Sequence, residues 1–100
     1  MKAVRFHDAA RAELLEEIRY YAGISPQLGE RLANEIEQAT RLASEFPDVG
    51  SPYKHGTRRV FPKKFPFSVI YVVRQSELYV LALAPFSRKP GYWRVRNKDG

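Results

Sequence analysis

Cysteine is absent from this 100-residue sequence, histidine occurs only twice, and no apolar run approaches the length of a membrane span. The lack of cysteine excludes disulfides, thiolate metal sites and a cysteine nucleophile, and it fits a reducing compartment. A bilayer-crossing helix needs about 20 consecutive apolar residues, and the N-terminal residues also lack the apolar centre of a secretory signal. We therefore expect a cytoplasmic protein that does not associate with membranes.

Several catalytic and cofactor motifs are also missing from the sequence. The two histidines, His7 and His55, are far apart and do not have the ligand spacing of a zinc site. The glycines match neither the dinucleotide-binding nor the P-loop spacing, and no serine outside turns and caps has a base nearby in the sequence. We expect no metal and no cofactor. The sequence leaves open whether the protein is an enzyme, and any catalysis would have to use Arg, Lys and Tyr side chains.

Charge is distributed very unevenly along the chain. Residues 1–50 carry six basic and nine acidic side chains, whereas residues 51–100 carry eleven basic and only two acidic ones. The carboxylates of the first half fall mostly on expected exposed helix faces, a pattern that does not favour a two-metal nuclease. The cationic second half indicates a face that meets phosphates or an acidic polypeptide.

The first half of the sequence has the periodicity of two helices. Apolar residues recur at helical spacing at Ala10, Leu14, Ile18 and Tyr21. Asp8 is a candidate N-cap for this helix and Gly23 is expected to end it. Ser25 and Pro26 then have the types preferred at the N-cap and first position of a second helix, of about 20 residues, which Pro47 ends. The short connection between the helices predicts an antiparallel hairpin.

The second half changes to β-type patterns. Residues 47–57 are rich in turn-forming types and are expected to be a loop. Strands are predicted at residues 4–6, 59–61, 65–74 and 78–84. These elements predict an α+β fold: an N-terminal strand, then an antiparallel helical hairpin packed on one face of a small, mainly antiparallel β-sheet. A chain of this length supports one core, so we expect a single domain over residues 1–100, with basic side chains on the other sheet face.

The side chains that could bind a ligand or take part in a reaction are cationic and aromatic, and they lie in the second half of the chain. Basic side chains bind phosphates and planar rings stack on unpaired bases. The same groups could support metal-free phosphodiester cleavage, with a guanidinium stabilising the charge on phosphorus and a Lys or Tyr moving protons. Arg88 is the strongest single candidate because it follows a buried strand, where a rigid scaffold can aim a side chain. Trp93 has an alternative role as a packing anchor for the C-terminal residues.

Several short motifs, in their order along the chain, resemble the RelE/ParE superfamily of toxins. They are Tyr20-Tyr21, Ser25-Pro26 with Leu28-Gly29, Arg58-Arg59, Phe65-Pro66-Phe67 with Ile70-Tyr71, and the sequence RKPGYW at residues 88–93. The likeness covers nearly the whole chain. The last two motifs are closer to the ParE-like branch than to the RelE-like branch.

This resemblance implies the toxin of a type II toxin–antitoxin system, in a hetero-oligomer with a cognate antitoxin that has an acidic, amphipathic C-terminal segment. ParE-like members poison DNA gyrase, whereas RelE-like members cleave messenger RNA on the ribosome without a metal. The ParE-like C-terminal motif and the absence of a dense lysine cluster favour gyrase poisoning. Ribosome-dependent cleavage, a non-enzymatic nucleic-acid-binding module and a degenerate toxin remain as alternatives.

The resemblance also implies roles for individual residues. Arg88 matches the family's basic residue after the last strand, Tyr92 lies near its C-terminal aromatic residue, and Arg59 and Lys64 lie where basic groups flank the strands. These four are the candidate catalytic residues. The candidate contacts to the target or to nucleic acid are Arg58, Lys63, Lys89, Trp93, Arg94 and Arg96. The sequence departs from the pattern at Pro85, where relatives commonly have a histidine, so any role of that histidine is lost or changed here.

Overall fold

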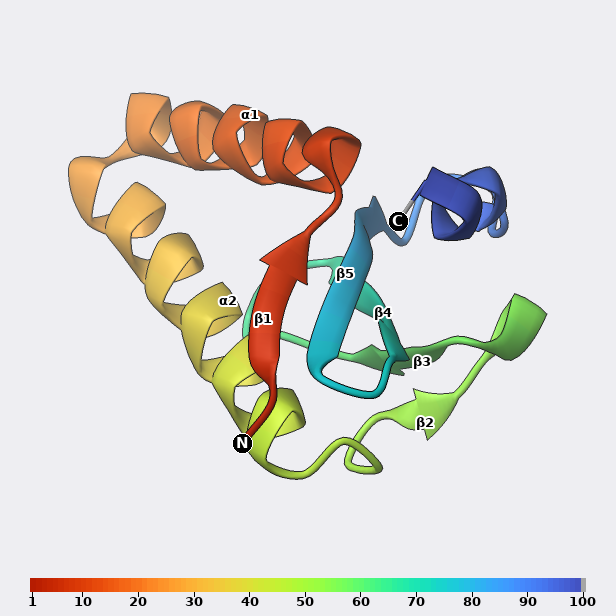
Figure 1. Cartoon of the computed structure of the whole chain (residues 1–100). Helices are drawn as coiled ribbons and strands as arrows, with labels where there is room; N and C mark the ends of the chain where they lie inside the picture. The colour runs from red at the N-terminus through yellow and green to blue at the C-terminus, as the bar shows by residue number, and fades with distance from the viewer. Residues whose placement is uncertain (100) are drawn as a thin grey trace.

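The computed structural model describes residues 1–99, in which one strand precedes two helices and a run of further strands (Figure 1). The elements are β1 (Ala3–Phe6), α1 (Asp8–Ile24), α2 (Pro26–Glu45), β2 (Ser51–Pro52), the 3₁₀ turn η1 (Lys54–Gly56), β3 (Arg58–Val60), β4 (Phe67–Val73), β5 (Glu77–Pro85) and the 3₁₀ helix η2 (Arg94–Asp99). Among the described residues, no helix combines the length and the apolar character that crossing a membrane requires.

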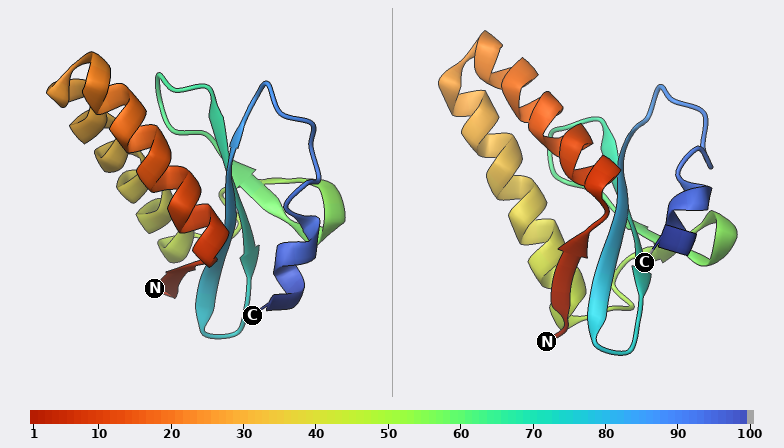
Figure 2. Two further views of the ribbon diagram at one scale, coloured as in Figure 1. Left: turned by 90° about the horizontal axis from the view of Figure 1, so that it is seen from above. Right: turned by 45° about the horizontal axis from the view of Figure 1, so that its top comes forward.

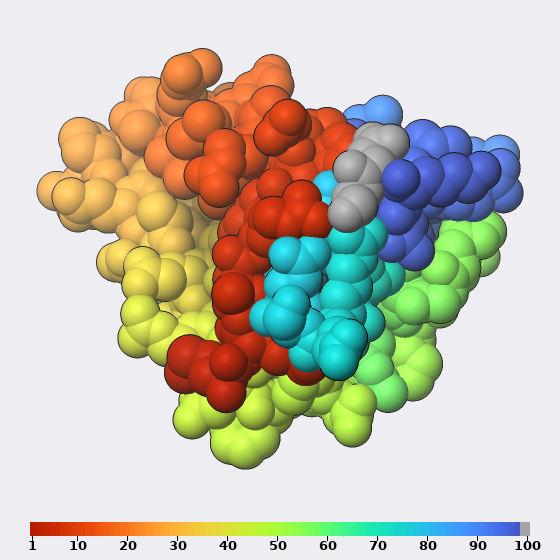
Figure 3. All heavy atoms as spheres, viewed as in Figure 1, coloured from red at the N-terminus to blue at the C-terminus, as the bar shows by residue number. Residues whose placement is uncertain are grey.

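The strands form one sheet in the order β1-β5-β4-β3-β2. Only the β1–β5 pair is parallel, and the other pairs are antiparallel. Figure 2 shows the helical hairpin on one side of this sheet and the C-terminal residues on the other. Figure 3 shows β1 at the surface between the helices and the β4–β5 turn. The predicted α+β architecture, with the hairpin on one face of a mainly antiparallel sheet, is confirmed.

The main core lies between the helical hairpin and the sheet. Leu32 and Ile36 of α2 pack with Phe67, Val69 and Tyr71, which alternate along β4 and so point to the same face. Ala10, from the first turn of α1, is fully buried in the same cluster. The apolar face of α2, with its 3.6-residue period, packs against the apolar face of β4, with its two-residue period. Both patterns are visible in the sequence because both faces are buried at this interface.

A second, smaller core lies on the opposite face of the sheet. Ile70 and Val72 of β4 and Leu81 of β5 form this cluster with Trp93, which comes from the C-terminal segment, defined as residues 86–99. Because β4 and β5 are central strands, both of their faces are apolar and need cover. The expectation that basic residues occupy this face is therefore wrong for its centre, which the C-terminal segment covers.

The boundary between the helices differs from the sequence prediction. Gly23 lies inside α1, which continues to Ile24, and the backbone N–H of Ser25 donates to the carbonyl of Tyr21. The chain leaves the helical conformation only at Ser25, whose φ is −161°, and the Ser25 hydroxyl donates to Gln27 rather than capping the backbone of α2. The antiparallel partner helix outweighs the local preference of glycine to end a helix.

Two other details were not predicted. His7, not Asp8, is the N-cap of α1, and its Nδ1 accepts a hydrogen bond from the Ala9 amide. The expected loop at residues 47–57 contains β2 and η1. The buried Tyr71 hydroxyl fixes this region, because it donates to the Pro47 carbonyl at 2.8 Å and accepts from the Gly50 amide at 2.9 Å.

Candidate functional site

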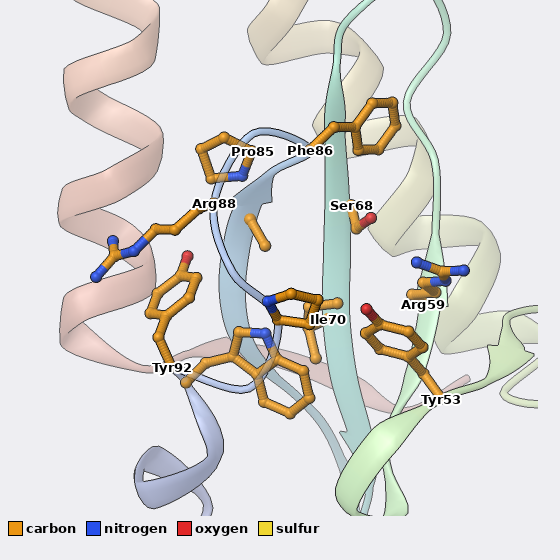
Figure 4. A pocket seen from close by; sticks show the side chains of 11 residues that line it. Tyr53, Arg59, Ser68, Ile70, Pro85, Phe86, Arg88 and Tyr92 are labelled. Atoms are coloured by element: carbon orange, nitrogen blue, oxygen red, sulfur yellow. The ribbon is translucent and has the colours of Figure 1, made fainter.

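A cavity of about 180 Å³ opens between the second face of the sheet and the C-terminal segment (Figure 4). Strands β3, β4 and β5, the residues around η1 and the C-terminal segment all contribute to its wall. Its lining consists of Tyr53, Arg59, Ser68, Ile70, Ala84, Pro85, Phe86, Arg88, Pro90, Tyr92 and Trp93. Two arginines and no carboxylate are present in this lining, so the cavity is suited to an anion.

Arg59 forms one side of the cavity. It lies on β3 opposite Ile70 of β4, and its guanidinium carbon is 4.0 Å from the Tyr53 ring centroid and 5.1 Å from that of Phe61. Its Nε is buried without a hydrogen-bond acceptor, and it forms no ion pair with any side chain that the structure describes. Two aromatic rings therefore hold a cation whose hydrogen-bond donors are unused.

Arg88 lies at the rim on the other side. Figure 4 shows its guanidinium directed toward α1, on the side of the cavity opposite Arg59. The guanidinium carbon is 3.5 Å from the Tyr92 ring centroid, and Nη1 is 3.9 Å from a carboxylate oxygen of Glu13. Since the side chain is about half exposed, this ion pair is weak.

The carboxylate of Glu13, on α1, holds the C-terminal segment in place. It accepts hydrogen bonds from the Leu83 amide at 3.1 Å, from the Tyr92 hydroxyl at 3.1 Å and from both terminal nitrogens of Arg96 at 3.0 Å. The Leu83 amide is available because β1 pairs with β5 only as far as Val80. We call Glu13, the Leu83 amide, Tyr92 and Arg96 the Glu13 cluster.

The model of the family described as "ParE toxin of type II toxin-antitoxin system, parDE" matches residues 4–97. The chain belongs to the ParE toxin family. A solved structure described as "Chromosomal ParDE TA system from P. aeruginosa" has a similar fold, with a TM-score of 0.73 and 20% sequence identity over 85% of this chain and 96% of that chain. No curated protein sequence matches the chain. The resemblance inferred from the motifs is thus confirmed at the level of the family and the fold.

The candidate catalytic residues of this ParE-family chain do not all meet in one place. Arg59, Arg88 and Tyr92 line the same cavity. Lys64 is exposed in the turn before β4, where it adopts a φ of 70°, and it is not part of the cavity lining. Within residues 1–99, no group of three or more metal-ligating side chains is present.

Tyr92 is poorly suited to proton transfer at neutral pH. Burial, followed by the negative charge of Glu13 and the hydrogen bond to it, raises the pKa of Tyr92 from 10.0 to about 12, against the opposing effect of Arg96 and Arg88. The phenol therefore remains protonated and donates to Glu13. Its position supports a structural role, since a general acid or base works best with a pKa near the operating pH.

Two of the candidate contact residues are mostly or fully buried. Trp93 is fully buried in the second core, a position that fits its alternative role as a packing anchor. The Arg96 side chain is only 14% exposed and is bound to Glu13 and to the Leu81 carbonyl. Neither side chain can meet a partner while the C-terminal segment stays in this position.

The remaining contact candidates lie outside the cavity lining. The Arg58 guanidinium donates to the Gly50 carbonyl at 2.6 Å and lies 3.5 Å from the Asp48 carboxylate. Lys63, Lys89 and Arg94 are exposed. Their charges can attract an anionic partner to this half of the molecule, although they do not line the cavity.

Sequence reasoning missed Glu13, which was grouped with the solvated carboxylates of the helices. Its side chain is only 19% exposed. A helical signal was available, because Glu13 lies three residues after the fully buried Ala10 and therefore shares its face of α1. Nothing local in the sequence indicates that its partners lie about 70 to 83 residues away, at Leu83, Tyr92 and Arg96.

A second concave surface lies between α2 and the strand β3. This groove, with a volume of about 340 Å³, is lined by Glu35, Gln38, Ala39, Leu42, Val60, Phe61, Pro62 and Lys63. Leu42 and Phe61 are exposed there, at 46% and 49%. We call this surface the α2–β3 groove.

Protein stability is predicted to fall between pH 10 and pH 12, because the folded state keeps Tyr92 neutral while the unfolded chain ionises it. The contribution of Tyr92 is complete below its ordinary pKa of 10.0 and is lost as the pH rises through about 12. Tyr92→Phe should therefore flatten this fall in urea-unfolding experiments, at the cost of about 1 kcal/mol at neutral pH from the lost hydrogen bond.

Tyr20→Phe is the matched control, since the Tyr20 ring is exposed, and it should leave the alkaline fall unchanged. A Tyr92→Phe variant with the alkaline profile of the unmodified protein would show that the Tyr92 phenol is not held neutral by the Glu13 cluster.

Proposed function

We propose that this ParE-family chain acts in the cytoplasm as a toxin that stops growth by poisoning DNA gyrase, and that a cognate antitoxin neutralises it. The observation that carries the proposal is the family match over residues 4–97. The exposed basic residues of the second half fit a target that includes DNA, because they can attract its phosphates.

The chemistry of the cavity supports poisoning rather than ribosome-dependent RNA cleavage. Its two arginines remain protonated at any physiological pH and cannot act as bases. The Tyr92 pKa is raised to about 12, and Lys64 lies outside the lining. We therefore assign Arg59 and Arg88 to recognition of the target, since the cavity lining offers a metal-free ribonuclease mechanism no residue suited to accept the proton of the attacking hydroxyl.

The predicted activity is inhibition of DNA supercoiling by purified gyrase. Arg88→Ala should weaken this inhibition about tenfold, because interface arginines commonly contribute more than 1 kcal/mol to binding. Arg31→Ala is the matched control, since it removes the same charge from an exposed position on α2, and it should retain full potency.

Unchanged supercoiling at a large molar excess of the folded toxin would contradict gyrase poisoning. Cleavage of messenger RNA in phase with the reading frame after induction would then support the ribonuclease alternative. Equal loss of potency in the Arg31 and Arg88 variants would indicate a general charge effect and no specific site.

For the antitoxin, we propose docking on the α2–β3 groove. The similar ParE-fold structure is described as a ParDE system. The groove offers exposed Leu42 and Phe61 for the apolar face of an amphipathic segment, and Lys63 for its acidic residues. An amphipathic helix binds such grooves through apolar residues at helical spacing. This site is separate from the cavity, although Phe61 adjoins both.

The predicted consequence is that Leu42→Asp weakens binding of the antitoxin's C-terminal segment at least tenfold in calorimetry, because it places a charge in the apolar groove. Leu15→Asp is a close control, since Leu15 of α1 is 47% exposed against 46% for Leu42. Equal affinities of the two variants would exclude the groove, provided that circular dichroism shows both to be folded.

A further inference from the structure

The cavity contains buried hydrogen-bond donors that have no acceptor. Arg59 Nε and Trp93 Nε1 are both buried and unpartnered, and both residues line the cavity. Trp93 is fully buried, so its indole forms part of the cavity wall and reports on what binds there. Buried donors without partners are rare in folded proteins because each one is destabilising. A ligand in the cavity that supplies acceptor oxygens would bind the Arg59 guanidinium.

The charge of Arg59 is not compensated by any carboxylate that the structure describes, in contrast to Arg58 and Arg96. Arg58 and Arg96 lie next to the carboxylates of Asp48 and Glu13, whereas Arg59 is held between the rings of Tyr53 and Phe61. The rings fix the direction of the guanidinium without neutralising it. A fixed guanidinium with free donors is well suited to phosphate, which it can bind with two parallel hydrogen bonds.

An exposed pair of aromatic rings lies beside this guanidinium. The centroids of Phe61 and Phe86 are 5.9 Å apart, and the two residues are 49% and 60% exposed. Phe86 lines the cavity and Phe61 contacts Arg59. Exposed rings next to a phosphate-binding cation are typical of proteins that stack unpaired bases.

We propose that this cavity binds a phosphodiester group of an unpaired nucleic-acid strand, with the Arg59 guanidinium as donor and with an adjacent base stacked on Phe86 or Phe61. Only an unpaired strand leaves base faces free to stack, so the site selects single-stranded over duplex nucleic acid. This proposal rests on the proposed function only in treating the cavity as part of the target-binding face. It gives the toxin a direct contact with the nucleic acid.

The tryptophan itself provides the first test. The chain has one tryptophan, so its ¹H–¹⁵N spectrum contains a single indole resonance, from Trp93. Titration of the full chain with hexathymidylate should shift this resonance and saturate it. Binding that leaves the indole resonance unmoved would overturn the proposal, and so would the absence of any binding at low salt.

The second test measures affinity for fluorescein-labelled hexathymidylate by anisotropy at several salt concentrations. Arg59→Gln should lower the affinity about tenfold and reduce the slope of log K against log salt by about 0.7, the value for one phosphate contact on a single strand. Phe86→Ala, which changes an exposed ring, should lower the affinity by a similar factor with the slope unchanged. Arg31→Gln, the charge-matched control on α2, should stay within twofold of the unmodified protein.

Equal affinities for the Arg59 and Arg31 variants would overturn the site. Inorganic phosphate and a hexaglutamate peptide are the competing probes. If phosphate alone shifts the indole resonance as strongly as the oligonucleotide, the site is a free-phosphate site. If the peptide binds more tightly, the occupant is an acidic polypeptide. These assays contain no gyrase, so their failure is distinct from failure of the supercoiling assay.

Discussion

The hydrogen bonds of the Glu13 carboxylate connect parts of the chain that the sheet alone does not join. From the first helix they reach the free edge of β5 at the Leu83 amide, and they hold the C-terminal segment through Tyr92 and Arg96. A mostly buried carboxylate is stable only when its oxygens are fully bonded, as they are here. The position of the C-terminal segment, and with it the second core and the cavity, depends on this arrangement.

The two cores explain why a chain of this size needs that connection. The helical hairpin covers only one face of the sheet, and the opposite face of β4 and β5 exposes Ile70, Val72 and Leu81 unless another element covers it. Trp93 contributes to that cover and is the largest of the fully buried side chains that the structure describes. The C-terminal segment does not fill the space beside Arg59, and this space is the cavity. The site is therefore a consequence of how the second core is closed.

The parts of the fold that the sequence predicted are those that regular patterns encode. The apolar stripe of α2 and the alternation in β4 are repeated several times, so each is visible without knowledge of the partner. Gly23 was misread because its helical surroundings outweigh its local preference. The two-residue strand β2 and the helix η2 were missed because their positions depend on distant contacts, such as that of the Tyr71 hydroxyl with the Pro47 carbonyl.

The same distinction applies to the site. Arg59, Arg88 and Tyr92 gather at the cavity because they follow or lie on the central strands, whose ends the sequence located well. The burial of Trp93 and Arg96, two of the candidate contacts, could not be inferred, because sequence gives residue type without burial. The importance of Glu13 could not be inferred, since its partners come from β5 and from the C-terminal segment.

The position of the C-terminal segment depends on Glu13 in this account, and the coupling energy between Glu13 and Arg96 tests that dependence most directly. It is measured by urea unfolding of the unmodified protein, Glu13→Gln, Arg96→Gln and the double variant. If the bidentate contact fixes the C-terminal segment, the coupling should be about 1–3 kcal/mol, and either single variant should expose Trp93 to a fluorescence quencher. A coupling below about 0.3 kcal/mol, with Trp93 still protected in both single variants, would contradict the central role of Glu13.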